Sequence, residues 1–518
     1  MTSRAPVLAE TLAPPHLAPW SRRLPALAAA LTTLLLGAIG LGGTQLWRDE
    51  LASWSAARRT VTELLAMTAN ADAFYLPYYL FLHYWMTLFG DSEVALRLPS
   101  LLAAAGTAAV VAALAGRWFG TRAGWCAGLL FALVPMVTRM AQEARPYAFV
   151  MLFIALSTYL LLRALDEPSW RHWAGYGVAL AAVGITQLTA FAIVAGHAVL
   201  VLAARQRPWR FALTALLAVL PAAPLAVLSL SGGQGAVGMI PRPGLLDLFG
   251  FTAVAPADSM MWPQLFRSTT TAWIVLALAL AALLLPQRRR AAGILAVAGV
   301  PILVLWAASQ AGPSFFFARY LVFLLPVLVV AAGVTLAAVR PQAVLAVALA
   351  AIAASTVPDQ LAARSPGAHD AAFYPYAMFT EGPGQYADYR QLADRLRRDA
   401  RAGDVIVYAN RPDFWFTDTA LDYHWRTPDR PRDVFLDRDP IANASLAGTE
   451  STAYAARLAG ADRVWVIGVG ERQDPFAGSP ALVAFPARPD KAAAVQAQFA
   501  LAEVERITGF TVALLHRR

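Results

Sequence analysis

The stretch Leu46-Trp47-Arg48-Asp49-Glu50-Leu51 follows an apolar run from Leu24 to Leu46 that contains no acidic or basic residue. A run of this length, 23 residues, can span a hydrocarbon core of about 30 Å. Two adjacent carboxylates beside such a helix are costly to desolvate, which makes them a functional-site hypothesis by default. The alternative is that they only mark the return of the chain to water.

Composition indicates that the whole chain is a polytopic membrane protein. Its 518 residues are 58% hydrophobic and 14% charged, whereas soluble domains average roughly 25% charged residues. Lys491 is the only lysine among 42 basic residues, and the arginines cluster in short loops between apolar runs. That pattern orients helices against the inner leaflet and does not indicate nucleic-acid binding. The single cysteine, Cys126, excludes an intrachain disulfide and a cysteine-based metal site.

The positions of the arginines predict which side of the membrane each loop occupies. Arg22 and Arg23 make residues 1–23 a cytoplasmic tail, so that Asp49 and Glu50 emerge on the outer face. The aromatic-rich residues 74–89 form either a short span or a juxtamembrane helix, and the later arginine loops fit best if they do not cross.

With that choice, residues 24–357 form a transmembrane domain of about 11 spans. Its first outer loop, residues 47–97, contains Asp49 and Glu50 and is the candidate catalytic loop. The 32 residues 173–204 carry no charge and are too long for one span, so we expect a hairpin that turns near residues 186–189. Residues 231–270 form a long external loop rich in glycine and proline.

The composition changes after Val357, and residues 358–518 predict a small extracytoplasmic α/β domain. Helix-like stretches at residues 389–401 and 491–506 alternate with β-branched runs at residues 405–408, 463–467 and 510–514. The predicted fold class is therefore an α-helical polytopic membrane protein with a C-terminal soluble α/β domain.

The predicted topology collects carboxylates and arginines on the outer face, including the segment Gln142-Glu143-Ala144-Arg145-Pro146. His197 is nearly the only ionisable group within the apolar spans, and we interpret it as a hydrogen-bonded packing residue. Transport would require polar groups at the midplane, so this distribution favours chemistry at the membrane surface.

Carboxylates and arginines at a membrane surface suit group transfer from a lipid phosphate. A carboxylate can take the proton of an attacking hydroxyl, while arginines or a metal stabilise the departing phosphate. A divalent metal is a possible cofactor, with Asp49 and Glu50 as its ligands, although adjacent carboxylates are a weak metal signal.

The order of these motifs resembles the GT-C class of polyprenyl-phosphate-sugar-dependent glycosyltransferases, in particular bacterial protein mannosyltransferases of family 39 and the aminoarabinose transferases. The resemblance covers roughly residues 24–340. It is carried by Trp47-Arg48-Asp49-Glu50, residues 88–100 (LFGDSEVALRLPS), Gln142-Glu143-Ala144-Arg145-Pro146-Tyr147-Ala148, and Ala318-Arg319-Tyr320-Leu321 followed by Pro326. Relatives often carry a His-Pro-Pro triplet near the end of the first outer loop, where this chain has Tyr75-Leu76-Pro77-Tyr78.

The resemblance implies an inverting transferase that moves a sugar, mannose in the first instance, from a polyprenyl phosphate to a glycan, lipid or protein acceptor outside the plasma (inner) membrane. Arabinose transfer to lipid or cell-wall glycan and a lipid-linked glycan transporter are the alternatives. The implied catalytic residues are Asp49, Glu50 and Glu143. The implied donor-phosphate ligands are Arg58, Arg145, Arg319 and Tyr320.

Overall fold

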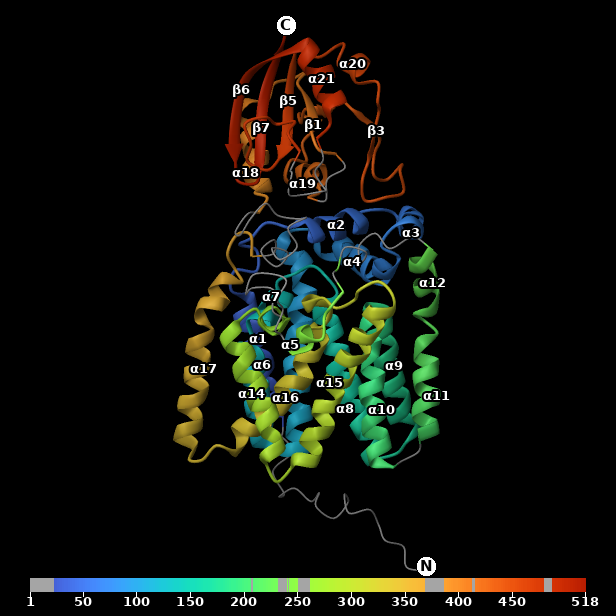
Figure 1. Cartoon of the computed structure of the whole chain (residues 1–518), viewed down its shortest axis with the longest axis vertical. Coiled ribbons are helices and arrows are strands. Elements are labelled where there is room, and N and C mark those ends of the chain that lie inside the picture. Colours follow the sequence, from blue (N-terminus) through green and yellow to red (C-terminus); the bar gives the residue numbers. More distant parts are fainter. Residues whose placement is uncertain are drawn as a thin grey trace, which may run out of the picture.

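The computed structural model describes residues 23–205, 208–231, 240, 242–249, 261–368, 386–411, 415–478 and 487–518. It consists of a long helical body and a smaller domain that contains a β-sheet, stacked end to end (Figure 1). Residues 1–22 of the predicted tail and most of the predicted loop at residues 231–270 lie outside the described residues. Both the mostly helical fold and the C-terminal β-containing domain confirm the predicted fold class.

The helical body is built from long apolar helices that run along its length (Figure 1). Four of the described helices are long and apolar enough to cross a membrane, and six spans result if each of two bent pairs counts as one. The long helices of the body, including those that fall short of this length, are α1 (Leu24–Ala38), α5 (Glu93–Phe119), the bent pair α6 (Thr121–Leu133) and α7 (Pro135–Ala141), α8 (Tyr147–Asp166), α9 (Trp170–Thr186), α10 (Ile193–Ala204), the bent pair α11 (Pro208–Val219) and α12 (Ala223–Ser231), α14 (Thr269–Ala281), α15 (Arg288–Ala311), α16 (Leu325–Ala338) and α17 (Gln342–Ala362).

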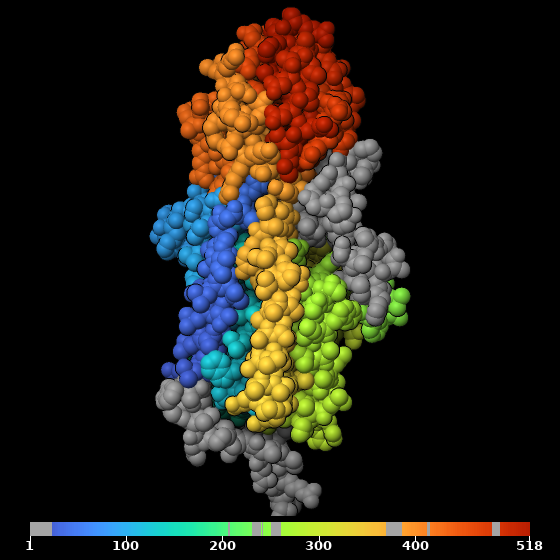
Figure 2. Space-filling model, turned by 90° about the vertical axis from the view of Figure 1, so that its left-hand side faces the viewer, coloured from blue at the N-terminus to red at the C-terminus, as the bar shows by residue number. Residues whose placement is uncertain are grey.

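These helices indicate that the chain is a multi-pass membrane protein. The count of 11 spans stays a prediction. The expected break in residues 173–204 is confirmed, because α9 ends at Thr186 and the short helix η2 (Leu188–Ala192) leads into α10. Figure 2 shows α17 along the outside of the body, where it leads toward the C-terminal domain.

The arginine-rich loops meet at the end of the body away from the β-sheet. Arg117 forms ion pairs of 3.1 Å with Asp166 and Glu167, and Arg290 donates to the backbone carbonyl of Trp118 at 2.8 Å. These contacts join the loops after α5, α8 and η5 (Ala282–Leu284). The predicted grouping of these loops on one side is therefore confirmed, whereas the identity of that side stays a prediction.

The first apolar run forms a shorter helix than predicted. We expected a span from Leu24 to Leu46, but α1 ends at Ala38. The glycines at positions 40, 42 and 43 explain the early end, because Gly40 adopts a φ of +76° that other residues rarely reach. Gln142 donates to the carbonyls of Gly37 and Ile39 at 2.8 and 2.7 Å, which satisfies the helix end.

Short helices cover the other end of the body. They are α2 (Arg48–Ala57), α3 (Val61–Asn70), η1 (Ala73–Tyr75) and α4 (Leu76–Phe89), and Figure 1 shows α2 and α4 at the end next to the β-sheet. A 14-residue helix such as α4 extends only about 21 Å, too short to span a bilayer. Its side chains Tyr84, Leu88 and Phe89 are exposed, as expected for a juxtamembrane helix in the aromatic belt.

The C-terminal domain contains a five-stranded sheet in the order β2-β1-β5-β7-β6. Strand β1 pairs in parallel with β2 and β5, while β7 pairs antiparallel with β5 and β6. The strands are β1 (Val405–Tyr408), β2 (Arg432–Asp433), β5 (Arg463–Val469), β6 (Phe499–Ile507) and β7 (Phe510–Arg517), with β3 (Leu436–Arg438) and β4 (Thr449–Glu450) in a second small sheet. Helices α18 (Tyr389–Asp399), α19 (Thr417–His424), α20 (Tyr454–Arg457) and α21 (Pro489–Gln498) complete the domain.

The predicted helix at residues 491–506 is wrong in its second half. Helix α21 ends at Gln498, and the next nine residues form strand β6, paired with β7 along its length. The strand lies at the edge of the sheet, and only its end residues Phe499 and Ile507 are buried. Pairing with a buried partner strand overrides the helical propensity of the alanines and glutamates in this segment.

Candidate active site

Asp49 lies in the first turn of α2, where its side chain meets an arginine from a distant part of the chain. Its Oδ2 accepts a 2.6 Å hydrogen bond from Nη1 of Arg319, and both side chains are 18% exposed. Burial disfavours the Asp49 carboxylate, but the charges of Arg319, Arg145 and Arg48 outweigh this and hold its pKa below the ordinary value. Asp49 is therefore ionised and still reachable.

Glu50 faces the opposite way and is fully buried. Its carboxylate accepts hydrogen bonds from Nε and Nη2 of Arg97 at 2.8 and 2.6 Å, and from the backbone N–H of Ala144 at 2.8 Å. Arg97 also donates to the carbonyls of Leu41 and Thr44, both at 2.9 Å. This bidentate pair fixes the start of α2 against α5 and the segment after α7.

Glu143 lies in that segment after α7, at the same end of the body as Asp49. Its carboxylate is 3.2 Å from Nη1 of Arg139, and both side chains are almost fully buried. Burial raises the pKa of Glu143 above its ordinary value, and the charges of Arg139 and Arg319 offset this only in part. The two predicted acidic segments thus meet, since the neighbouring Ala144 binds Glu50.

Arg145 connects α2 with the turn before α4. Its Nη1 donates to Oγ of Ser53 at 3.2 Å and to the backbone carbonyl of Asp49 at 3.4 Å. Its guanidinium also lies 4.0 Å from the centre of the Tyr75 ring. Arg145 is thus held by neutral groups of α2 and η1, beside the Asp49 carboxylate.

Asp72 is a third carboxylate near this site, and it was not among the predicted site residues. It has a positive φ of 56° just before η1 and accepts a 2.9 Å hydrogen bond from Tyr79. Burial raises the pKa of Asp72, although Arg145 acts in the opposite direction. Only its place just before the aromatic-rich residues 74–89 could have drawn attention to it.

Several guanidinium groups lie around the ring of Trp47. Arg48, Arg139 and Arg319 lie 5.8, 5.4 and 5.9 Å from the ring centre. Cation–π attraction compensates part of the cost of bringing like charges together. We call the set of five arginines near Asp49 and Glu143 the arginine cluster; its members are Arg48, Arg139, Arg145, Arg267 and Arg319.

Arginines outnumber carboxylates in this part of the structure once Glu50 is paired with Arg97. The five arginines of the cluster face four carboxylates: Asp49, Asp72 and Glu143, and Asp359 near Arg267. Burial raises the pKa values of two of these carboxylates, Asp72 and Glu143. An excess of positive charge attracts an anion, and the planar guanidinium fork matches a phosphate.

The two remaining predicted phosphate ligands lie in different places. Tyr320 follows Arg319 in η6 (Ala318–Tyr320), and its backbone carbonyl accepts a 2.6 Å hydrogen bond from Gln187. Arg58, in contrast, follows the far end of α2, where it stacks 4.8 Å over Trp54 and lies 3.8 Å from Asp422 of α19. The structure therefore brings Asp49, Glu143, Arg145, Arg319 and Tyr320 together, and it does not bring Arg58 to them.

The possible metal site at Asp49 and Glu50 stays a prediction. The two carboxylates bind different partners, Arg319 for Asp49 and Arg97 for Glu50. Within the described ranges, no group of three or more His, Cys, Asp or Glu side chains is placed to hold a metal ion.

Comparison with known proteins adds a family match and a fold match. Residues 76–229 match the model of the dolichyl-phosphate-mannose-protein mannosyltransferase family. No curated relative matches the chain. The fold is similar to that of ArnT from Cupriavidus metallidurans in the apo state, with a TM-score of 0.60 and 13% identity over 94% of this chain and 97% of that one.

ArnT from the same organism bound to undecaprenyl phosphate is also similar, with a TM-score of 0.58 and 14% identity over 96% of this chain and 98% of that one. The family match lies within the helical body and includes α4, Glu143 and Arg145. Together, the match over residues 76–229 and the shared fold identify this chain as a membrane glycosyltransferase of the GT-C class.

Proposed function

We propose that this protein transfers a sugar from a polyprenyl phosphate to an acceptor hydroxyl on the outer face of the plasma membrane. The observation that carries the proposal is the arginine cluster with the ionised Asp49 inside it. The similarity to ArnT, which binds undecaprenyl phosphate in one structure, supports a polyprenyl-phosphate donor. Mannose is the proposed sugar because the matching family is named for mannose transfer.

In the proposed reaction, the acceptor oxygen attacks the anomeric carbon of the donor sugar from the side opposite the phosphate. The bond between that carbon and the phosphate oxygen breaks, and the phosphate leaves with the electron pair. Asp49 takes the proton of the acceptor hydroxyl. Arg145, Arg319 and Tyr320 bind the phosphate and stabilise its developing charge, and attack from the opposite side inverts the anomeric centre.

Donor binding also prepares Asp49 for this role. Arg319 holds Asp49 at 2.6 Å before a phosphate arrives, and a carboxylate in such a pair is a weak base. A phosphate that competes for Arg319 weakens this ion pair, so the pKa of Asp49 rises toward the operating pH. Asp49 therefore becomes a better proton acceptor only when the donor is present.

The other acidic residues have supporting roles in this proposal. Glu50 is saturated by Arg97 and the N–H of Ala144, so it positions the start of α2 and does not contact substrate. Glu143 orients Arg139 beside the cluster, and Asp72 faces Arg145 from the side of η1. Arg58 is left out because it contacts the C-terminal domain.

A panel of labelled donors tests the proposal. Purified full-length protein in nanodiscs is incubated with polyprenyl phosphates that carry mannose, arabinose, aminoarabinose or glucose, and the sugar that is released or transferred is counted. We expect turnover of the mannose donor. Turnover of the arabinose donor alone would replace mannose by the alternative sugar, and turnover of none of the four would refute glycosyl transfer from these lipids.

A further inference from the structure

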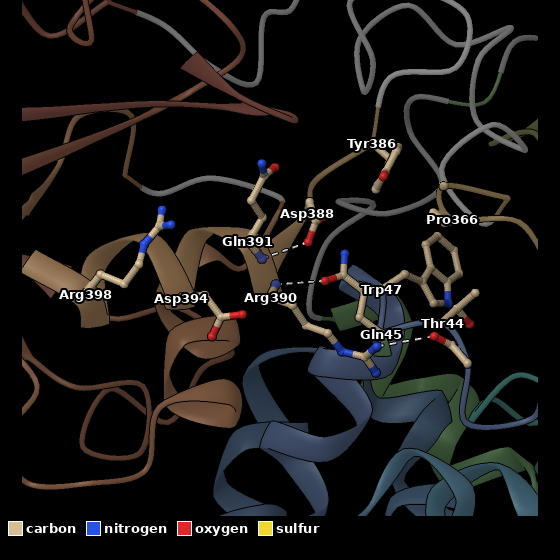
Figure 3. Close-up of a pocket in the computed structure, with 12 residues that line it drawn as sticks. Thr44, Gln45, Trp47, Pro366, Tyr386, Asp388, Arg390, Gln391, Asp394 and Arg398 are labelled. Atoms are coloured by element: carbon tan, nitrogen blue, oxygen red, sulfur yellow. Dashed lines mark hydrogen bonds between the residues drawn. The ribbon is translucent and has the colours of Figure 1, made fainter. Parts of the chain in front are cut away.

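A pocket with a volume of about 500 Å³ lies between the helical body and the C-terminal domain. One wall comes from the segment between α1 and α2, and the opposite wall comes from α18 and the residues just before it (Figure 3). We call it the interdomain pocket. Its lining includes Gln45 and Trp47 from the helical body and Tyr386, Asp388, Arg390 and Arg398 from the C-terminal part of the chain.

The interdomain pocket is adjacent to the candidate active site. Trp47 lines the pocket, and the same ring lies 5.9 Å from the guanidinium of Arg319, which binds Asp49. Asp49 itself follows Trp47 by two residues in the first turn of α2. A molecule in the pocket is therefore separated from the proposed base by little more than the Trp47 side chain.

The lining of the pocket combines aromatic rings with polar side chains. Tyr386 is partly exposed and contributes ring surface, while Trp47 is almost fully buried in the wall. Asp388, Gln391 and Asp394 contribute acceptors and donors of hydrogen bonds (Figure 3). A sugar ring needs both kinds of surface, because its C–H face packs on an aromatic ring and its hydroxyls are donors and acceptors at once. The volume is typical of a site for a small ligand.

The charges in the pocket also fit an uncharged saccharide better than the phosphate of the donor. Arg390 and Arg398 are matched in number by Asp388 and Asp394 among the lining residues. Arg390 already forms a 2.8 Å ion pair with Glu93. The arginine excess that attracts a phosphate is therefore on the Asp49 side of Trp47 and is absent from the described lining of this pocket.

The two walls are held together by contacts that cross the domain boundary. Gln45 accepts a 3.0 Å hydrogen bond from the N–H of Arg390 and donates to the carbonyl of Ala387. Arg390 donates to the carbonyl of Gly43 at 3.3 Å and forms its ion pair with Glu93 of α5. The C-terminal domain thus forms half of a preformed pocket beside the site and does more than cover it.

We propose that the interdomain pocket binds the saccharide part of the acceptor, and that the part of the acceptor with the reacting hydroxyl extends from the pocket past Trp47 to Asp49. This inference rests on the proposed glycosyl transfer and adds to it the chemical class of the acceptor and the place where the acceptor binds. The C-terminal domain then selects the acceptor, while the helical body binds the donor and performs the reaction.

Blocking the pocket at its outer edge separates acceptor binding from donor chemistry. Arg398 lines the pocket and is exposed, so Arg398→Cys can be labelled with fluorescein maleimide, whereas the native Cys126 is buried. The matched control is Arg432→Cys, an exposed arginine of the same domain that does not line the pocket. Sugar released to water and sugar transferred to a panel of methyl glycosides are measured with the labelled full-length proteins.

We expect the label on Arg398→Cys to raise the KM for the preferred methyl glycoside about tenfold or more, with release to water unchanged within twofold. Saturation-transfer NMR of the same glycoside should show contact with wild-type protein and with labelled Arg432→Cys, and loss of contact with labelled Arg398→Cys. Octyl glycosides in nanodiscs, run alongside, distinguish a lipid-anchored saccharide from a soluble one.

Three results would count against the proposal in different ways. Equal KM values for the two labelled proteins would remove the acceptor from the interdomain pocket. Wild-type protein that releases sugar to water but neither binds nor glycosylates any glycoside would refute a saccharide acceptor. Absence of both sugar release and sugar transfer with every donor would refute the proposed function itself, independently of the NMR binding result.

Discussion

Two buried ionic clusters of this protein differ in how their charges are balanced. In the C-terminal domain, Arg411 lies 3.0 Å from Asp418 and 2.6 Å from Asp433, and Lys491 lies 2.6 Å from Glu450. We call these five residues the C-terminal ion network. Both of its cations have carboxylate partners, whereas the arginine cluster of the helical body has five cations for four carboxylates.

The difference indicates what each cluster is for. A buried cation surrounded by carboxylates is already compensated, so the C-terminal ion network needs no ligand. It serves to hold the segment after β1 together with α19, β2, β4 and α21. An excess of arginine, in contrast, is a cost of folding that a bound anion repays. Damage to the arginine cluster should therefore affect catalysis and lipid binding, and damage to the C-terminal ion network should affect stability.

Asp49→Asn gives the largest expected effect. The amide keeps the shape of the side chain but cannot accept the proton, so sugar transfer should fall by about 10²- to 10⁴-fold, while binding of polyprenyl phosphate is retained. Transfer is measured with the labelled donor at saturation, and the folded fraction is checked by gel filtration. Transfer at the wild-type rate would show that Asp49 is not the base.

Arg97→Ala is expected to unfold the site and not only to inactivate it. Removing one partner of a fully buried ion pair costs about 3–5 kcal/mol, and Glu50 would remain buried without its guanidinium. The thermal unfolding midpoint in nanodiscs should fall accordingly. Arg58→Ala is the control, because its exposed contact with Asp422 contributes about 0–1 kcal/mol; equal midpoints for the two variants would contradict the role given to Glu50.

Lys491→Met tests the other side of the comparison. It leaves Glu450 buried beside Arg411, so the free energy of unfolding should fall by about 3 kcal/mol, the lower end for a broken buried pair, because a protonated Glu450 limits the cost. Sugar transfer per folded molecule should stay within twofold of the wild-type value. A large loss of transfer with unchanged stability would show that the C-terminal ion network takes part in the reaction, and would contradict the difference proposed between the two clusters.

Arg319→Gln should shift the pH dependence of the reaction. Arg319 is the strongest influence that lowers the pKa of Asp49, against burial, which raises it. Without Arg319, the effect of burial is opposed by fewer positive charges, so the pKa of Asp49 rises. The acidic limb of the pH–rate profile should therefore move to higher pH. The matched control is Arg58→Gln. An acidic limb that stays in place or moves to lower pH would show that Asp49 does not control it.

Much of the fold followed from residue patterns that depend on local physics. Arginine loops, uncharged runs and β-branched segments predicted the helical body, the break at residues 186–189 and three of the strands. His197 was interpreted as a packing residue, and its two ring nitrogens are indeed hydrogen-bonded to Thr158 and Tyr176. The end of α1 and strand β6 were missed, because a glycine conformation and pairing with a distant strand decide them.

The candidate site was predictable in its residue types but not in its pairing. Asp49 and Glu50 are neighbours in the sequence, yet the turn of α2 directs one toward Arg319 and the other toward Arg97. Asp72 and Trp47 become part of the site only because distant segments of the chain place arginines beside them. The interdomain pocket could not be read from the sequence, since its walls are more than 300 residues apart.

Binding of an unglycosylated polyprenyl phosphate to the arginine cluster is the most direct test. Its Kd is measured at one ionic strength for wild-type protein, Arg145→Gln/Arg319→Gln and the control Lys491→Met. We expect the double variant to bind roughly 10- to 100-fold more weakly, as the loss of charged hydrogen bonds implies, and the control to bind as wild type does. Equal Kd values for wild type and the double variant would place the lipid phosphate elsewhere.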